Sequence, residues 1–225
     1  MSAPLRLVIF DVDGTLVDSQ VSIVTAMTAA FQAVGVPVPD RAAILSIVGL
    51  SLDQAMEQLV PDQPLVTRDR LVAAYKDAYH ANRLQLGAGS APLYPGARAM
   101  LQRLHAVPEI LLGIATGKSR RGLDALLEAH DLARYFVTQQ VADHHPSKPH
   151  PSMVLTAMDQ AGTTPADTVM IGDTRFDMQM AQAAGVSGIG VDWGYHPAHS
   201  LQTPHILSDF DQLPATLTRL WGIAT

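Results

Sequence analysis

The chain of 225 residues contains no cysteine, which excludes disulfide bonds, thiolate metal sites and cysteine nucleophiles. It also lacks an apolar run of the roughly 18 residues that a membrane-spanning helix needs, and its N-terminus shows no signal-peptide pattern. Acidic residues outnumber basic ones and the formal net charge is -6, so the basic face of a nucleic-acid-binding protein is missing. We therefore expect a cytoplasmic protein with neither a membrane nor a nucleic acid as partner.

Short apolar segments rich in β-branched residues alternate with amphipathic helical patterns over most of the chain. Because strands buried on both faces have apolar runs of this kind, the alternation predicts an α/β fold with a doubly wound, Rossmann-like parallel sheet. The expected strands are residues 5–11, 110–116, 168–174 and 187–192, with weaker candidates at 134–140 and 205–207. The expected helices between them are residues 95–106, 121–131, 151–162 and 177–185.

The stretch from residue 19 to about 85 breaks this alternation, because it contains helical patterns and no strand pattern. We expect an all-helical cap domain, residues 17–91, inserted into an α/β core made of residues 1–16 and 92–225. Ligands of open parallel sheets bind beyond the carboxyl ends of the strands, so the insertion would cover the site. Helical spacing favours packing over substrate contact for four of its side chains, Met27, Met56, Tyr75 and Tyr79.

Charged and polar residues stand at the ends of the expected strands or before an expected helix. Because parallel strands end at one edge of a sheet, we expect these side chains to converge. They are Asp11, Asp13, Thr116, Lys118, Lys148, Asp173 and Asp177.

Clustered carboxylates repel one another unless a cation neutralises them, and an all-oxygen ligand set favours Mg2+. Lysines beside such an ion would bind phosphate oxygens, and a threonine hydroxyl can donate to a phosphoryl oxygen. A carboxylate that attacks phosphorus forms an aspartyl-phosphate, while a second acid can protonate the leaving oxygen. The pattern therefore favours phosphoryl-transfer chemistry.

Four motifs occur in the order DVDGT, TGK, KP and GDxxxD, and together they resemble the haloacid dehalogenase (HAD) superfamily. The helical insertion after the first motif resembles members with a C1-type cap. The chain is most similar to phosphoglycolate-phosphatase-type enzymes in the segments VDS, VGLSLDQ, YPG and VDWGYHP. The resemblance spans residues 8 to about 197 and implies a Mg2+-dependent phosphatase that acts on a small phosphorylated metabolite through an aspartyl-phosphate.

The resemblance also implies roles for the residues of the first motif. Asp11 would be the nucleophile and a Mg2+ ligand. Asp13 would be the general acid and base, and its backbone carbonyl would bind Mg2+. Gly14 and Thr15 would shape the turn that follows the nucleophile, and Gly14 would border the phosphate site.

The remaining motifs receive roles in the same way. Thr116 and Lys118 would hold the phosphoryl group, and Gly117 would let the backbone approach it. Lys148 would pair with Asp11 and the phosphate. The resemblance assigns Asp173 to Mg2+ and Asp177 to the orientation of a water molecule or of Lys148.

Alternative functions differ from this interpretation at particular positions. Ile23 stands where sugar phosphomutases of this fold carry a histidine, which counts against a mutase. Dehalogenases and phosphonatases lack an acid at the position of Asp13. A phospho-acceptor signalling domain is disfavoured by the D-x-D spacing and by the insertion. A pyrophosphatase of the same fold stays open, as do the physiological substrate and the choice between monomer and homodimer.

Several other polar residues receive weaker interpretations. His144, His145 and His150 lie in a proline-rich loop, where solvation is the simpler explanation than metal binding. Arg120, Arg121 and Arg175 are expected to be surface charges, with Arg175 near enough to steer phosphates. The loop of Gly49, Leu50 and Ser51 is expected to face the site from the cap.

Overall fold

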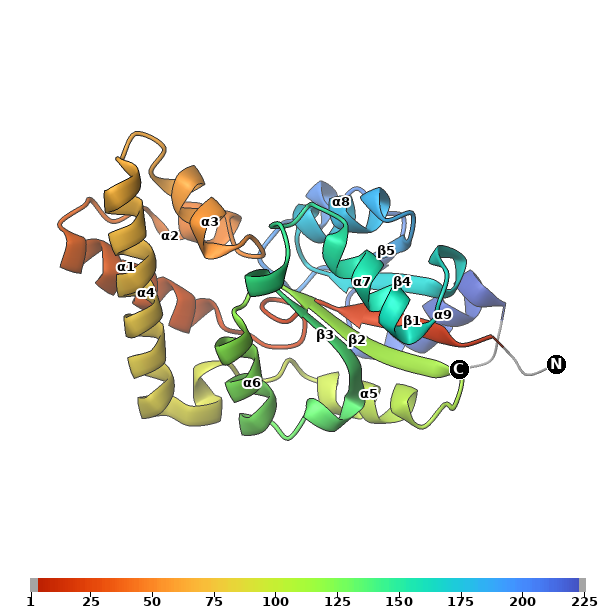
Figure 1. Cartoon of the computed structure of the whole chain (residues 1–225). Helices are drawn as coiled ribbons and strands as arrows, with labels where there is room; N and C mark the ends of the chain where they lie inside the picture. The colour runs from red at the N-terminus through yellow and green to blue at the C-terminus, as the bar shows by residue number, and fades with distance from the viewer. Residues whose placement is uncertain (1–3, 223–225) are drawn as a thin grey trace.

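A computed structural model describes residues 4–222, and its centre is one sheet of six parallel strands (Figure 1). The strand order is β3-β2-β1-β4-β5-β6, which is the order of a doubly wound Rossmann-type sheet. The predicted α/β class with a parallel sheet is therefore confirmed. The strands are β1 (Arg6–Phe10), β2 (Ile110–Thr116), β3 (Phe136–Val141), β4 (Thr168–Gly172), β5 (Ser187–Val191) and β6 (Ile206–Leu207).

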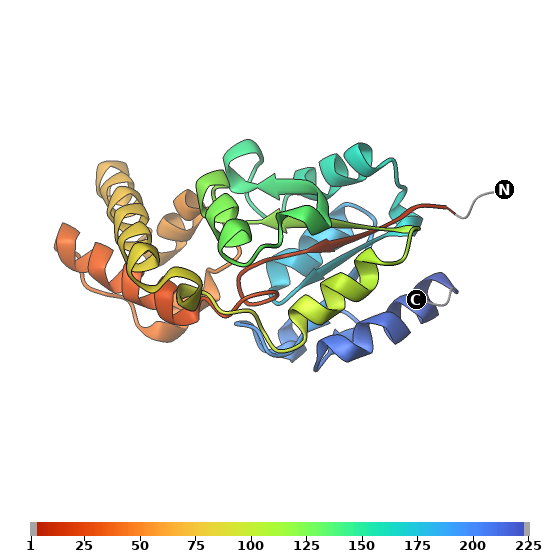
Figure 2. The same cartoon turned by 90° about the horizontal axis from the view of Figure 1, so that it is seen from below.

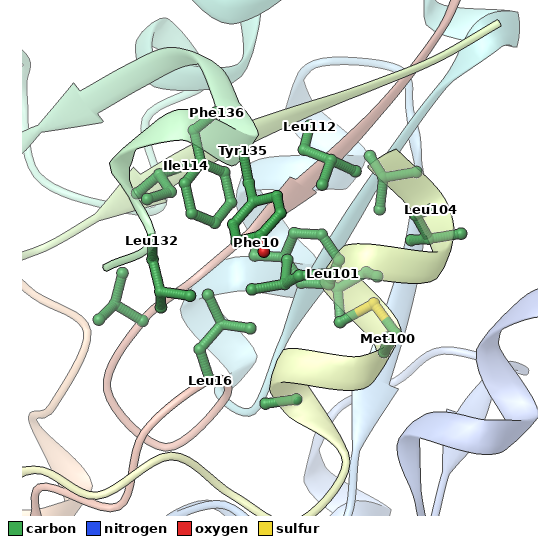
Figure 3. Packing of buried hydrophobic residues seen from close by; sticks show 14 of the residues in the cluster. Phe10, Leu16, Met100, Leu101, Leu104, Leu112, Ile114, Leu132, Tyr135 and Phe136 are labelled. Atoms are coloured by element: carbon green, nitrogen blue, oxygen red, sulfur yellow. The ribbon is translucent and has the colours of Figure 1, made fainter. Parts of the chain in front are cut away.

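Side chains of each strand alternate between the two faces of the sheet, and both faces are apolar. In β1, Val8 and Phe10 join one hydrophobic cluster, while Leu7 and Ile9 join the other. Because successive strand residues point to opposite faces, a run without polar residues is what a strand covered on both sides requires. Figure 3 shows Phe10 packed among the aliphatic and aromatic side chains of the first cluster.

Helices cover both faces of the sheet. The cluster around Phe10 includes side chains of α5 (Ala97–His105), α6 (Arg120–Ala129) and α9 (Leu213–Trp221), and Figure 2 shows α5 and α9 on the same side of the sheet. The opposite cluster includes α7 (Ser152–Ala161) and α8 (Arg175–Ala183). These layers leave the carboxyl edge of the sheet free of core helices.

Four helices stand apart from the sheet at that carboxyl edge (Figure 1). We call residues 20–86 the helical segment; it contains α1 (Gln20–Val34), α2 (Arg41–Ser46), α3 (Leu52–Leu59) and α4 (Leu65–Leu86). Met27, Phe31 and Met56 belong to a hydrophobic cluster that these helices form among themselves, with Phe176 of α8 added. Over residues 4–222, none of the helices combines the length and the apolar character that a membrane crossing requires.

The chain enters and leaves the helical segment through two connecting segments that lie next to each other. Val17 pairs with Leu93 in an antiparallel bridge, and the Asp18 amide donates to the Pro92 carbonyl at 2.8 Å. The turn before this crossing depends on Gly14, which has a φ of +81° that favours glycine. The two connections therefore lie side by side next to the end of β1.

The boundaries of some elements differ from the sequence expectation for local reasons. β3 begins at Phe136 because residues 133–135 form a 3-10 turn. α8 begins at Arg175 because Thr174 and Asp177 form a capping box, in which each side chain accepts from the other's backbone amide. α4 continues to Leu86, just beyond the helical stretch expected to end at about residue 85, and α9 was not among the expected helices.

Candidate active site

Asp11 directly follows β1 and is the most buried acid of the first motif, with 1% of its surface exposed. Its backbone amide donates to the Ile171 carbonyl of β4 at 2.9 Å, which fixes the residue between two central strands. Lys148 Nζ lies 3.0 Å from Asp11 Oδ1 as an ion pair. Neither carboxylate oxygen of Asp11 has a hydrogen bond of normal geometry from the described residues.

Lys148 is held between two carboxylates in the protein interior. Its ammonium donates to Asp177 Oδ1 at 2.6 Å while it contacts Asp11. Asp177 Oδ2 accepts from the amide and the hydroxyl of Thr174, at 3.0 and 2.6 Å, as part of the α8 capping box. The start of a core helix therefore fixes the lysine, and the lysine places one positive charge beside Asp11.

Asp173 follows β4 and is completely buried. Its Oδ1 accepts from the Thr15 hydroxyl at 3.0 Å, and its Oδ2 accepts from the Tyr195 amide at 2.8 Å. A Cβ atom at Gly14 would lie 2.2 Å from Asp173 Oδ2, so a side chain there would displace this carboxylate. The turn after β1 thus approaches Asp173 closely enough to need glycine.

Three carboxylates are close enough to share a cation. Asp11, Asp173 and Asp177 each offer an oxygen atom, and these atoms lie within 4.8 Å of one another. The oxygens of Asp177 are already engaged by Lys148 and Thr174, whereas those of Asp11 have free acceptor capacity. Buried oxygens without donors and an all-oxygen set fit a hard divalent ion such as Mg2+.

The electrostatics of this cluster follow from burial. Burial raises the pKa of Asp11 to about 7, repulsion from Asp177 and Asp13 adds to the rise, and Lys148 opposes it. Burial likewise raises the pKa of Asp173 well above its usual value. Burial lowers the pKa of Lys148, but Asp11 and Asp177 outweigh this effect and hold the pKa above its ordinary value. The lysine therefore stays charged, and a further cation would stabilise the ionised form of the carboxylates.

Asp13 points to a different set of partners. Its Oδ1 accepts from Lys118 Nζ at 2.9 Å and from the Ser19 hydroxyl in a short contact. Tyr195 supports Ser19, because its hydroxyl accepts from the Ser19 amide at 2.9 Å. Lys118 also donates to the Tyr79 hydroxyl of α4 at 3.1 Å. The structure therefore places Lys118 on Asp13 and links both to the helical segment.

Thr116, the last residue of β2, and the residues that follow it lie at the same edge of the sheet. Thr116 Oγ1 accepts from the Lys118 amide at 3.2 Å, which leaves the hydroxyl proton available for a ligand oxygen. A Cβ atom at Gly117 would lie 2.6 Å from the Leu50 carbonyl and 2.7 Å from the Gly49 carbonyl. Glycine at this position lets the loop of the helical segment lie directly against the core.

A cavity of about 490 Å³ lies between the core and the helical segment. The core contributes Asp11, Asp13, Thr116, Gly117 and Lys118 to its lining. Lys148, Asp173 and Asp177 are buried beside Asp11 and do not line the cavity. The predicted site residues thus converge on one edge of the sheet, with one group facing the cavity and a second group holding Asp11 in place.

Comparison with known proteins agrees with this geometry. Residues 8–191 match the family described as haloacid dehalogenase-like hydrolases. The chain belongs to this family. It is 39% identical to the probable phosphatase IndB of Dickeya dadantii, with 90% of this chain and 89% of that protein covered. It is 31% identical to the phosphoglycolate phosphatase of Salmonella paratyphi A, with 94% and 92% covered. The predicted resemblance to the HAD superfamily and to its phosphoglycolate-phosphatase-type members is confirmed.

Solved structures of the family have the same overall arrangement. A haloacid dehalogenase-like hydrolase from Streptococcus pneumoniae superposes with a TM-score of 0.81 at 25% identity, covering 95% of this chain and 98% of its own. A hydrolase from Pseudomonas syringae superposes with a TM-score of 0.83 at 25% identity, covering 98% and 100%. The chain is therefore an enzyme, a HAD-like hydrolase with the fold of its family.

In this HAD-like hydrolase, the four side chains that helical spacing assigned to packing do pack in the helical cluster. Met27 and Met56 are buried members of that cluster, and Tyr75 and Tyr79 pack against it, as expected. Met27, Tyr75 and Tyr79 also line the cavity. Helical periodicity places them on one face, and that face borders the cavity as well as the core of the helical segment.

The arginines of this hydrolase divide into two groups. Arg121 is exposed, as expected for a surface charge, and it also lines the cavity. Arg120 instead donates to the Gln139 side chain at 2.9 Å, and Arg175 lies 5.0 Å from the Phe176 ring centroid. Cavity residues His80 and Arg83 carried no motif in the sequence and were not predicted.

Proposed function

We propose that this enzyme is a Mg2+-dependent phosphatase that hydrolyses a small phosphomonoester through an aspartyl-phosphate on Asp11. The observation that carries the proposal is the state of the Asp11 carboxylate. It is buried at the end of a central strand, reaches the cavity, forms an ion pair with Lys148 and has no hydrogen bond of normal geometry from the described residues to either oxygen. A positioned carboxylate of this kind is suited to attack phosphorus.

Asp11, Asp173 and the backbone carbonyl of Asp13 would hold the Mg2+ ion. When bound, the ion neutralises the carboxylates and the negative charge that develops on the phosphoryl oxygens. Asp177 keeps Lys148 in place, as the 2.6 Å hydrogen bond between them supports. Thr116 and the amides that follow it donate to the phosphoryl oxygens.

The first half-reaction transfers the phosphoryl group to the enzyme. An Asp11 oxygen attacks phosphorus, a bond from that oxygen to phosphorus forms, and the bond from phosphorus to the leaving oxygen breaks. Asp13 gives a proton to the leaving oxygen, so the product departs as a neutral alcohol. Ser19 and Lys118 hold the Asp13 carboxyl in a single orientation toward the cavity.

The second half-reaction releases phosphate. Asp13, now deprotonated, takes a proton from a water molecule, and the water oxygen attacks phosphorus. The bond between phosphorus and Asp11 then breaks, which regenerates the carboxylate and frees inorganic phosphate. Lys148 stays charged throughout and stabilises the regenerated carboxylate.

We further propose that residues 17–91 form a cap domain on a core of residues 1–16 and 92–225. The two adjacent connections at Val17 and Leu93 support this division, as does the separate hydrophobic cluster of the helical segment. Movement about these connections would admit the substrate, and closure would exclude water from the aspartyl-phosphate. The names of the curated relatives support a phosphatase and make phosphoglycolate a candidate substrate.

Turnover of a generic ester tests the proposal. The enzyme should release many equivalents of phosphate from p-nitrophenyl phosphate with Mg2+, and chelation by EDTA should abolish the release until Mg2+ is restored. A screen of small phosphate esters ranked by kcat/KM then identifies the preferred leaving group. Stable incorporation of a single phosphate without turnover would contradict the proposal and indicate a phospho-acceptor domain.

A further inference from the structure

A cluster of two arginines and one histidine lines the cavity and connects its two walls. His80 and Arg83 belong to α4 of the helical segment, and Arg121 belongs to α6 of the core. Arg83 Nη2 lies 2.9 Å from His80 Nδ1, and Arg121 Nη2 lies 2.8 Å from His80 Nε2. Arg83 Nη1 also donates to the Arg121 carbonyl at 3.4 Å. Two guanidinium groups from opposite walls therefore meet at one imidazole.

The hydrogen bonds of this cluster cannot all be satisfied from within. A neutral imidazole has one acceptor nitrogen and one N–H group, whereas a guanidinium has donors only. One of the two arginines must therefore face an N–H of His80. Burial and the charges of Arg121 and Arg83 lower the pKa of His80, so the ring stays neutral between them. The cluster is short of acceptor atoms, which an oxyanion would supply.

Nearby carboxylates do not neutralise the cluster. Within residues 4–222, neither Arg83 nor Arg121 forms a salt bridge with a carboxylate. Asp77 on the same helix raises the pKa of His80, but as the smallest contribution. Asp143, which also lines the cavity, accepts from the Arg120 amide at 2.7 Å. The wall formed by these arginines thus keeps its positive charge.

The cluster lies away from the proposed phosphoryl site. Tyr79 contacts Lys118, which in turn contacts Asp13, so Tyr79 borders the reacting centre. Arg83 follows Tyr79 by four residues, about one helical turn or ~6 Å along α4. Cavities of about 490 Å³ hold ligands much larger than a two-carbon acid. A molecule that contacts both ends of the cavity must be extended.

We propose that His80, Arg83 and Arg121 form a second anion-binding subsite, which selects phosphomonoesters whose leaving group carries a carboxylate or a second phosphate at its far end. This inference rests on the proposed phosphatase function and narrows its substrate class. Guanidinium groups bind carboxylate and phosphate through paired charge-assisted hydrogen bonds. Because the arginines come from both walls, a bound anion also joins the helical segment to the core.

Matched pairs of esters test the subsite in the wild-type enzyme. 6-Phosphogluconate and sorbitol 6-phosphate have the same chain length and differ in one terminal group, a carboxylate or a neutral alcohol. Fructose 1,6-bisphosphate and fructose 6-phosphate make the same comparison with a second phosphate. We expect kcat/KM to be at least about tenfold higher for the doubly anionic member of one pair, the pair whose anion the subsite prefers.

Variants of the two arginines provide a second test of the subsite. Arg83→Gln and Arg121→Gln should each lower the kcat/KM ratio of the preferred pair at least about fivefold, mainly through KM. Arg83→Lys should keep part of the preference because it keeps the charge. The matched control is Arg70→Gln, an exposed arginine on α4 that does not line the cavity, and it should leave the ratio unchanged.

The outcomes separate this inference from the function on which it rests. Absence of p-nitrophenyl phosphate turnover by the wild-type enzyme would overturn the phosphatase function itself. If the enzyme turns over p-nitrophenyl phosphate but the kcat/KM ratio is near one in both ester pairs, the subsite alone is overturned. The subsite is also overturned if the arginine variants lose kcat/KM equally on the two esters of a pair. A larger loss on phosphoglycolate than on 6-phosphogluconate would overturn the distal position of the anion.

Discussion

The two walls of the cavity are built in different ways. On the core wall, Asp11 directly follows a central strand and is almost completely buried, and Asp173, which also follows a central strand, is buried beside it. On the other wall, Tyr79, His80 and Arg83 lie partly exposed on one face of a single helix. The core side brings together four carboxylates whose negative charge two lysines offset only in part, whereas Arg83 adds positive charge on the opposite side of the cavity.

This difference separates chemistry from recognition. Strand ends are held by backbone hydrogen bonds on both sides, so the reacting groups have one geometry for any substrate. Side chains on an exposed helix face can change without disturbing the sheet. Changes on the core wall should therefore affect every ester to a similar degree, while changes on the helical wall should alter the ranking of esters.

The largest effect is expected for Asp11→Asn. Removal of the nucleophile should lower kcat by about 10⁴-fold or more for every ester, because no bond to phosphorus can form. Circular dichroism should show an intact fold, since Lys148 keeps Asp177 as its partner. The exposed Asp62→Asn is the matched control and should retain wild-type rates. Wild-type activity in Asp11→Asn would remove the proposed nucleophile.

Lys148→Met should damage both stability and activity. The change leaves two buried carboxylates without their cation, which costs about 3–5 kcal/mol in the free energy of unfolding. Urea denaturation in the absence of Mg2+ measures this loss. The double variant Lys148→Met/Asp177→Asn should lose less free energy of unfolding than the sum of the losses in the two single variants, because the two residues are in contact. Additive losses would show that the ion pair is not coupled.

Asp11 should make the stability of the metal-free core depend on pH. Its folded-state pKa of about 7 lies above the usual value of 3.8, so the folded protein binds an extra proton between these pH values. Its contribution to stability is therefore greatest at low pH and is lost as pH rises toward 7. The Tm of the wild type minus that of Asp11→Asn should fall by at least about 2 °C between pH 5 and pH 7.5 in EDTA. A difference that rises with pH would contradict the burial of this carboxyl.

The smallest effect is expected on the helical wall. Tyr79→Phe removes the hydroxyl that accepts from Lys118 and should lower kcat/KM about threefold to tenfold. The loss should vary among esters, because the side chain lines the cavity. Tyr135→Phe, in the core away from the cavity, is the matched control. If Tyr79→Phe lowered kcat/KM by the same factor for every ester in a panel, Tyr79 would act on the chemical step, as the core residues do, and not on substrate selection.

The same contrast explains what could be predicted from the sequence. Asp11, Thr116 and Asp173 follow apolar runs that are recognisable as buried strands, and parallel topology brings strand ends to one edge. Convergence of these residues therefore followed from local patterns. The order of the motifs along the chain indicates the family from the sequence alone.

The cavity residues of the helical segment could not be found in that way. Tyr79 and Arg83 share a helix face, but periodicity does not tell whether a face meets its own domain or a distant one. The contact of Arg121 with His80, and that of Tyr195 with Ser19, join residues far apart in the chain. Lys118 was expected on the phosphoryl group, and its pairing with Asp13 emerged from the folded arrangement alone.

The most direct test of the central claim is a crystal structure of the enzyme with Mg2+ and beryllium fluoride, which mimics a phosphoryl group on a carboxylate. We expect the beryllium to be bonded to an Asp11 oxygen, the ion to contact Asp11 and Asp173, and Thr116 to contact the fluorides. Beryllium fluoride bonded to another residue, or an ion bound away from Asp11 and Asp173, would contradict the claim that these strand ends form one phosphoryl-transfer site.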